Sequence, residues 1–412
     1  MINQDLLFQK HLAGAESLIN RRARLLKKAC NGAQHQATRQ KLIGHLSYLA
    51  DFPNEIDFTD AKTITCQLCV LALQPRFSRE VERVATELTE ANVFDHLTQV
   101  FEAIDITGFT LWKAVLQYII LRSLLPDDVS WKLVARFSPL LEPSSLVSPT
   151  KGMLFYPGQL SALACQSTFV VDSMLNPAFQ LIGEQAFEAD LYWFALRLNK
   201  SGHHQTSEFM RRWLDVVPGS PWALRASIVS GRAEFASALH QAVKNENIEA
   251  VELALHGCPE HLVFCLELLK LPRFNKQAAE LWERLTATPL TKRARIQTVG
   301  SNSDADASGD HVSTSNGGGN VEKVGDDAGD EVGEWACPDD AEKQYRQLDP
   351  SLAYWRGQPF SQKALVIESL HSYGAHSERM LHTVWAHCQT NFVCLPNEPN
   401  RQRQARLKEV AT

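Results

Sequence analysis

Residues 231–286 read GRAEFASALHQAVKNENIEAVELALHGCPEHLVFCLELLKLPRFNKQAAELWERLT, and this stretch decides the fold. Apolar residues recur at steps of three and four within 233–243, 248–255, 261–269 and 278–285. That spacing predicts four short helices, separated by the runs KNEN, HGCP and LPRFN. Two helices in about thirty residues are typical of a stacked array, in which each helical pair covers the apolar face of its neighbour.

The rest of the chain follows the same pattern, beginning with an apolar stripe within residues 8–26. Ser361 is the predicted cap of a helix over 364–370, and Ser377 the predicted cap of a helix over 381–388. Alternating apolar runs joined by hairpin turns, which a sheet needs, are not found. We therefore expect an all-α protein, an α-solenoid of short antiparallel helix pairs (HEAT-like), with a disordered acidic linker and a small C-terminal helical unit.

The acidic linker is recognised by its composition. Residues 301–334 hold nine Asp and Glu against one Lys, so this segment carries −8 of a chain whose net charge is −6, and the remainder carries +2. Gly, Ser, Asn and Asp dominate the segment, which cannot bury enough apolar area to offset chain entropy. The sequence divides into an N-terminal helical array (1–140), a Pro-rich crossover (141–158), HEAT-like repeats (159–295), the acidic linker (296–340), a C-terminal helical pair (341–395) and a basic tail (396–412).

Composition and termini exclude several classes of protein. With 412 residues and 44% hydrophobic residues, the chain can bury a core. Its nine cysteines lack the dense, regular spacing of a disulfide scaffold, so we expect reduced thiols. No secretory leader is visible, and the apolar window 111–125 is short and contains Lys113 and Arg122, so we expect a cytoplasmic protein without membrane insertion. Outside the acidic segment the chain is nearly neutral and lacks the broad positive field that nonspecific nucleic-acid binding needs, so we expect no nucleic-acid partner.

Two groups of potential metal ligands stand out, and both favour packing. Cys66 and Cys69 have the spacing of a zinc or redox pair, but no second ligand pair accompanies them. Cys258, His261 and Cys265 form a better cluster, although three such residues on an apolar helix more often pack in a core. Phosphate-loop, nucleophile-elbow and dinucleotide motifs are missing. We therefore expect no enzyme, no catalytic residue, no cofactor and no metal.

Residues that could bind a partner occur in two places. One is the basic run near residue 21, although a solvated helix face is the more frequent explanation of such a run. The other is the aromatic motif at residues 354–360, which could instead pin the C-terminal helices onto the array. The candidate partner-binding residues are Tyr354, Trp355, Arg356, Phe360, Arg21, Arg22 and Arg24.

The motif Tyr354-Trp355-Arg356-Gly357-Gln358-Pro359-Phe360, followed by the cap Ser361, by Gly374 and by Arg379, resembles the C-terminal end of a family of HEAT-like helical-repeat proteins. Members of that family are often encoded beside type VI secretion components. The likeness covers residues 128–388 in outline, and the acidic insertion is a departure that leaves the register of the final repeat open. The resemblance supplies no catalytic residue that can be carried over.

These observations lead to a functional expectation. A curved array offers a long surface for binding, so we expect a protein–protein interaction scaffold or adaptor. By resemblance, it would be a bacterial accessory of type VI secretion, with secretion components or effectors as partners. The alternative is a helical-repeat enzyme or nucleic-acid modifier that uses a basic concave groove. An ankyrin-like reading of residues 247–257 also predicts binding, but the Thr-Pro-Leu-His turn of that repeat is missing.

Overall fold

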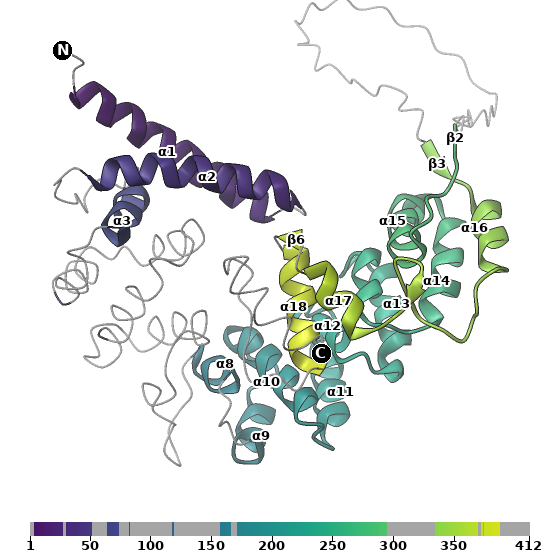
Figure 1. Ribbon diagram of the computed structural model, residues 1–412. Helices are drawn as coiled ribbons and strands as arrows, with labels where there is room; N and C mark the ends of the chain where they lie inside the picture. The colour runs from purple at the N-terminus through teal and green to yellow at the C-terminus, as the bar shows by residue number, and fades with distance from the viewer. Residues whose placement is uncertain are drawn as a thin grey trace, which may run out of the picture.

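The computed structural model describes most of the C-terminal two thirds of the chain and part of the N-terminal third (Figure 1). The described residues are 4–27, 30–51, 64–73, 82, 118, 157–165, 171–294, 334–369, 372–373 and 375–387. They are mostly helical, with a few strands of two or three residues, as expected for an all-α protein. The helices predicted between residues 78 and 139, most of the Pro-rich crossover, most of the acidic linker and the basic tail lie outside the described residues.

The N-terminal part is a helical hairpin with a third helix against it. Helices α1 (Gln4–Lys27) and α2 (Gly32–Ala50) pack along each other, and α3 (Ile64–Leu73) contacts both. The predicted stripe is buried at Ala15 and Ile19, where it meets Leu42, Leu46 and Leu49 of α2. Strand β1 (Cys30–Asn31) pairs antiparallel with β6 (Ser372–Tyr373), which joins this hairpin to the C-terminal part of the chain.

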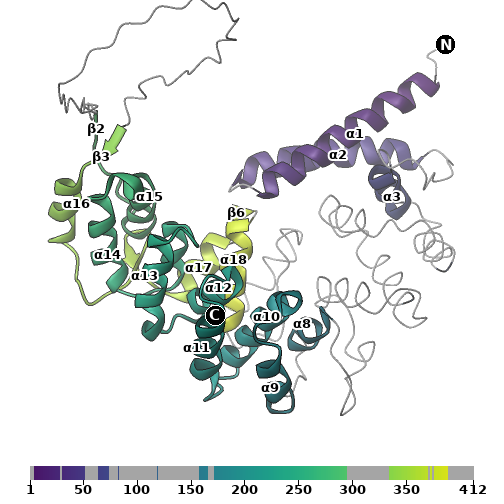
Figure 2. The ribbon, with the colours of Figure 1, turned by 180° about the vertical axis from the view of Figure 1, so that it is seen from behind.

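The array that follows consists of short helices, each packed on its neighbours (Figures 1 and 2). Helix α10 contacts α8 and α12, while α15 contacts both η6 and α14. Its elements are α8 (Gln159–Ala164), α9 (Val171–Gln180), η4 (Gln185–Phe187), α10 (Glu188–Lys200), α11 (Thr206–Val216), α12 (Pro221–Ser230), η5 (Ala233–Phe235), α13 (Ala236–Lys244), η6 (Ala250–Leu255), α14 (Glu260–Leu269), η7 (Pro272–Phe274) and α15 (Asn275–Thr286).

The four helices predicted within residues 231–286 exist with two changes. Helix α14 matches 261–269 closely, and α15 begins three residues before the predicted start at Ala278. The segment 248–255 forms the 3-10 helix η6 in place of an α-helix, and 233–243 begins with the 3-10 turn η5. Tight 3-10 turns suit segments this short, because they satisfy backbone groups within three residues.

The C-terminal elements belong to the same core as the array. They are α16 (Pro338–Tyr345), β4 (Tyr354–Trp355), β5 (Gln358–Pro359), α17 (Gln362–Ser369) and α18 (Ala375–His387). Strand β2 (Lys292–Ala294) pairs with β3 (Glu334–Ala336), so the two ends of the acidic segment lie side by side. Helix α18 packs on α10 and α12, and its Met380, Leu381 and Val384 join the buried cluster of the array. The expectation of a C-terminal unit separate from the array is corrected accordingly.

One of the two predicted serine caps is present. Ser361 accepts a hydrogen bond from the backbone N–H of Ala364 at 3.2 Å, which confirms the cap of α17. Helix α18 already begins at Ala375, so Ser377 lies within its first turn and the cap predicted there is wrong. The sequence hid this start because the first residues of α18 carry no apolar stripe.

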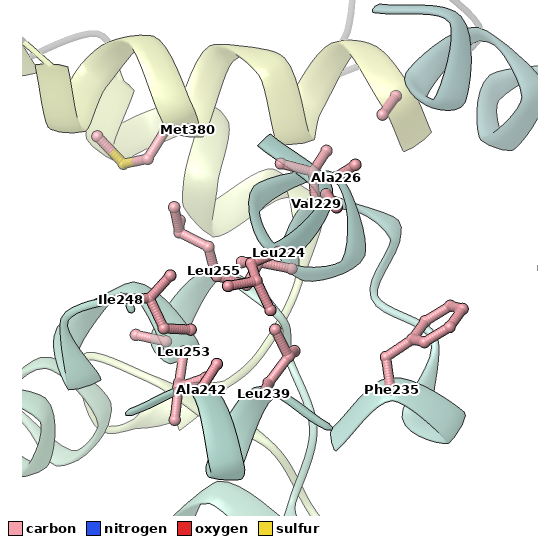
Figure 3. Packing of buried hydrophobic residues seen from close by; sticks show 14 of the residues in the cluster. Leu224, Ala226, Val229, Phe235, Leu239, Ala242, Ile248, Leu253, Leu255 and Met380 are labelled. Carbon is pink, nitrogen blue, oxygen red and sulfur yellow. The ribbon is translucent and has the colours of Figure 1, made fainter. Parts of the chain in front are cut away.

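A buried carboxylate fixes α18 on the array. Glu252 of η6 is 6% exposed, and its Oε1 lies 2.8 Å from Nη1 of Arg379 on α18. Its Oε2 lies 3.8 Å from Nε of Arg225 on α12. Figure 3 shows apolar side chains of the same elements and of α13, including Leu253 of η6, Leu224 of α12 and Met380 of α18. Three elements distant in sequence are thereby held together.

Among the residues that the structure describes, none of the helices has the length and apolar character needed to cross a bilayer.

Candidate functional site

Three histidines form a row at the junction of α13, η6 and α14. Nε2 of His240, on α13, lies 2.9 Å from Nδ1 of His261, in the first turn of α14. Nε2 of His261 lies 2.9 Å from Nδ1 of His256, which directly follows η6. Nε2 of His256 lies 3.0 Å from the backbone oxygen of Arg232. The row therefore runs from the partly exposed ring of His240 to the backbone carbonyl of Arg232.

The carbonyl at the end of the row fixes the tautomers. Because the Arg232 oxygen can only accept, His256 donates to it from Nε2, and in a neutral ring its Nδ1 then accepts. His261 accordingly donates from Nε2 to His256 and accepts at Nδ1 from His240. Every hydrogen bond of the row is satisfied with one proton on each ring, so three neutral imidazoles are the natural state of the row.

Burial favours this neutral state. It lowers the pKa of His256 from its ordinary value of 6.5 to about 4, against the bond to Arg232, which raises it. Burial also lowers the pKa of His240 to about 4, helped by the charge of Lys244. The pKa of His261 lies well below the ordinary range, first through burial and then through its two histidine neighbours.

These pKa directions predict acid sensitivity. Between pH 6.5 and 4 the unfolded chain binds a proton at His256 and the folded chain does not, so stability is complete above pH 6.5 and falls as the pH falls. For metal-free protein, His256 alone lowers the free energy of unfolding by about 2 kcal/mol at pH 5. Urea titrations in a chelating buffer at pH 7.5 and 5 measure this difference. His256→Gln is expected to reduce it, and equal stability of the wild type at both pH values would contradict the assignment.

The turn between η6 and α14 brings a thiol to the same place. One ligand atom each of His256, Cys258 and His261 lies within 4.8 Å of the others, and all three residues are buried. Burial raises the pKa of the Cys258 thiol, while a hydrogen bond with the backbone of Glu260 lowers it. Two nitrogens and a sulfur at this spacing are a donor set that could hold a metal ion.

Gly257 makes this turn possible. Its φ is +67°, a conformation that residues with side chains rarely adopt. A Cβ at this position would lie 2.6 Å from a ring carbon of Phe360, so the ring of this predicted partner-binding residue packs directly on the turn. The Phe360 ring and the absence of a side chain at Gly257 together hold His256 and Cys258 in place.

The structure keeps two of the three residues of the predicted cluster and replaces the third. Cys258 and His261 are together as expected, but the Cys265 thiol donates to the backbone oxygen of Ala278 at 3.1 Å and takes no part. His256 takes its place. The spacing His-x-Cys-x-x-His was visible in the sequence and could have indicated it, whereas His240 lies sixteen residues earlier on another helix and carried no local signal.

The other candidate ligands remain apart. Cys66 and Cys69 are buried on α3, and burial raises the pKa of the Cys66 thiol to about 12, as expected for packed thiols. His382 contacts the hydroxyl of Tyr192 at 2.8 Å, and His387 contacts the backbone oxygen of Val229 at 2.6 Å. These two C-terminal histidines thus help to attach α18 to the array.

The aromatic motif is a β-hairpin that closes the end of α15. The backbone N–H groups of Arg356 and Gly357 donate to the carbonyls of Arg284 and Leu285, at 2.9 and 2.8 Å. The last carbonyls of a helix lack partners within it, and this turn supplies two. Arg356 and Gly357 both have positive φ, as a two-residue hairpin turn requires.

Burial decides which predicted partner-binding residues face solvent. Tyr354 and Trp355 are 7% and 2% exposed, so they pin the hairpin in the core. Arg356 is exposed and pairs with Glu368 through two hydrogen bonds, of 2.9 and 2.6 Å. In the basic run, Arg21 and Arg24 are exposed on α1, whereas Arg22 is buried. The alternative in which the motif pins the C-terminal helices fits Tyr354 and Trp355, which are buried beside α15 and α17, and Arg22 is likewise buried.

The described residues thus define a mostly helical protein in which a histidine row and a buried thiol lie between packed helices. No protein-family model, curated protein or solved structure matches this chain.

Proposed function

We propose that this chain is a non-enzymatic protein–protein interaction scaffold or adaptor that serves type VI secretion, in assembly or in effector loading. The observation that carries the proposal is the packing of short helices from α9 to α15, in which each α-helix contacts the next one along the chain. In its finer form the architecture is an α-solenoid of antiparallel, HEAT-like pairs. Such arrays bind partners along an extended surface that needs no catalytic residue.

The connection with secretion rests on the resemblance of the motif at residues 354–360. Its hairpin caps α15 and its Phe360 ring covers the turn at Gly257, so the motif completes the end of the array. A scaffold whose last repeat is closed in this way keeps its other surfaces free for a partner.

The exposed basic residues of α1 are the part of the predicted surface best suited to docking. Arg21 and Arg24 lie on the solvent side of the helix, while Arg22 is buried in the hairpin. A pair of exposed guanidinium groups favours an acidic protein surface, since complementary charge steers association and selects partners.

The test is co-purification of the tagged full-length chain with named secretion components, expressed together in the same cells. We expect the wild type to retain a secretion component or effector. The double variant Arg21→Glu and Arg24→Glu is expected to reduce its recovery several-fold, because it places like charges against the partner.

The matched control reverses two exposed lysines of the same helical hairpin, Lys10→Glu and Lys41→Glu. Both double variants change the net charge equally, so a general charge effect would reduce recovery in both. Failure of the wild type to retain any secretion component would contradict the proposed function. Equal loss in the two variants would contradict the role of Arg21 and Arg24.

A further inference from the structure

We propose that His256, Cys258 and His261 bind one zinc ion. Their ligand atoms lie within 4.8 Å of one another, and Nδ1 of His256 faces Nε2 of His261 at 2.9 Å. In a tetrahedral zinc site two nitrogen ligands lie roughly 3.4 Å apart, as follows from zinc–nitrogen bonds of about 2.0–2.1 Å. To receive the ion, the two rings therefore need to separate by a few tenths of an ångström and to turn until both lone pairs point at it.

The donor types select the metal. Two imidazole nitrogens and a thiolate suit zinc, whereas magnesium and calcium require oxygen ligands. With three protein ligands, a water molecule completes four-fold coordination. The site joins the end of η6 to the first turn of α14, so the ion would brace the turn on which Phe360 packs.

The surroundings of the ligands have the form of an outer coordination shell. Metal-bound histidines almost always donate their other ring N–H to a carbonyl, carboxylate or comparable acceptor. His256 does so already, from Nε2 to the Arg232 carbonyl. The Nδ1 of His261 faces Nε2 of His240 and can donate to it once the tautomers of these two rings exchange. The orientation of both rings is thus fixed by groups that do not bind the ion.

Zinc binding requires the Cys258 thiol to lose its proton and the protons on two of the rings to move. The thiol of Cys258 loses its proton to solvent and its sulfur bonds to zinc, with the backbone of Glu260 hydrogen-bonded beside it. His261 frees Nε2 for zinc and carries its proton on Nδ1, while His240 carries its own on Nδ1. All three rings stay neutral, and one proton is released for each zinc ion bound.

The test uses the full-length chain, freed of metal with a chelator and titrated with Zn²⁺ and, as a spectroscopic probe, Co²⁺. We expect one ion per chain, a sulfur-to-cobalt charge-transfer band and displacement of cobalt by zinc. Cys258→Ser is expected to abolish the band. The matched control is Cys265→Ala, which removes a buried thiol seven residues away and is expected to keep both band and stoichiometry.

His240→Phe tests the outer shell. The His240 ring stacks on Phe264 with centroids 3.9 Å apart, and a phenyl ring can keep that stack while removing the acceptor for His261. We expect zinc affinity, measured in competition with a chromophoric chelator, to fall about 10–100-fold.

A wild-type chain that binds no cobalt, or binds it without the charge-transfer band, would overturn the proposal. Persistence of the band in Cys258→Ser would overturn it as well. If that variant does not fold, as judged by circular dichroism, the wild-type spectrum and stoichiometry alone decide. None of these outcomes depends on whether the chain is a secretion adaptor.

Discussion

Trp355→Ala should lower the free energy of unfolding by about 3–5 kcal/mol, the usual cost of removing a buried Trp. Its side chain is 2% exposed, and its Nε1 donates to Oε2 of Glu368 at 2.8 Å. The guanidinium of Arg284 lies 5.8 Å from the ring centroid and donates to Oε1 of Glu368 at 3.0 Å. Truncation would leave a cavity between α15 and α17 and remove one donor from a partly buried carboxylate. Urea unfolding at pH 7.5 measures the loss.

Two further variants test whether Trp355 stabilises the core or is available to bind a partner. Trp355→Phe keeps an aromatic ring and loses the N–H, and Arg356 still donates to the same carboxylate oxygen, so we expect a cost of about 1–2 kcal/mol. Leu352→Ala removes a partly exposed apolar side chain from the same region and should cost under about 0.5 kcal/mol. If Trp355→Ala leaves stability unchanged, the hairpin is not part of the core and its Trp becomes available for a partner.

Glu252→Ala should lower the free energy of unfolding by about 3 kcal/mol, because it leaves two guanidinium groups without their shared carboxylate. Burial raises the pKa of Glu252, although the charges of Arg379 and Arg225 lower it. Water reaches both arginines, with 27% and 35% of their side chains exposed, and this keeps the loss at the lower end for a buried pair. Helix α18 should loosen first, which hydrogen exchange of its backbone amides would reveal.

Comparing Glu252→Ala with Glu267→Ala distinguishes the effect of losing a buried carboxylate from that of losing an exposed one. Glu267 lies 3.9 Å from Lys244 with 61% of its side chain exposed, so Glu267→Ala should change stability by under about 1 kcal/mol. Replacing Glu252 and Arg379 together, by Leu and Met, should recover part of the loss, since only the partly exposed Arg225 then lacks its carboxylate. Equal effects of Glu252→Ala and Glu267→Ala would show that burial of Glu252 contributes nothing.

Much of the helical content could be predicted from the chain itself. The stripe near Ala15, the helix at 261–269 and the Ser361 cap all depend on residues three or four apart, which interact within one element. The 3-10 form of η6 and the early start of α18 were missed. Both depend on contacts with other elements, such as the bond between Glu252 and Arg379, and these override local preference.

The candidate site was predicted in part for the same reason. Cys258 and His261 lie three residues apart in the sequence, and this proximity is enough to predict that they cluster. Cys265, at the expected helical spacing, is turned toward α15 by its bond to Ala278, and His240 arrives from a different helix. Spacing within one helix places side chains on a face, but it does not say what the opposite helix brings to that face.

The sequence by itself determined that this protein is built from short amphipathic helices, because apolar periodicity is a local property that each segment expresses alone. Only the tertiary structure decided that Tyr354 and Trp355 are buried, that the C-terminal helices share the core of the array, and that three histidines and a thiol meet between α13 and α14. These outcomes depend on which apolar faces cover each other, and that choice is made by packing among segments far apart in the sequence, such as α10 and α18.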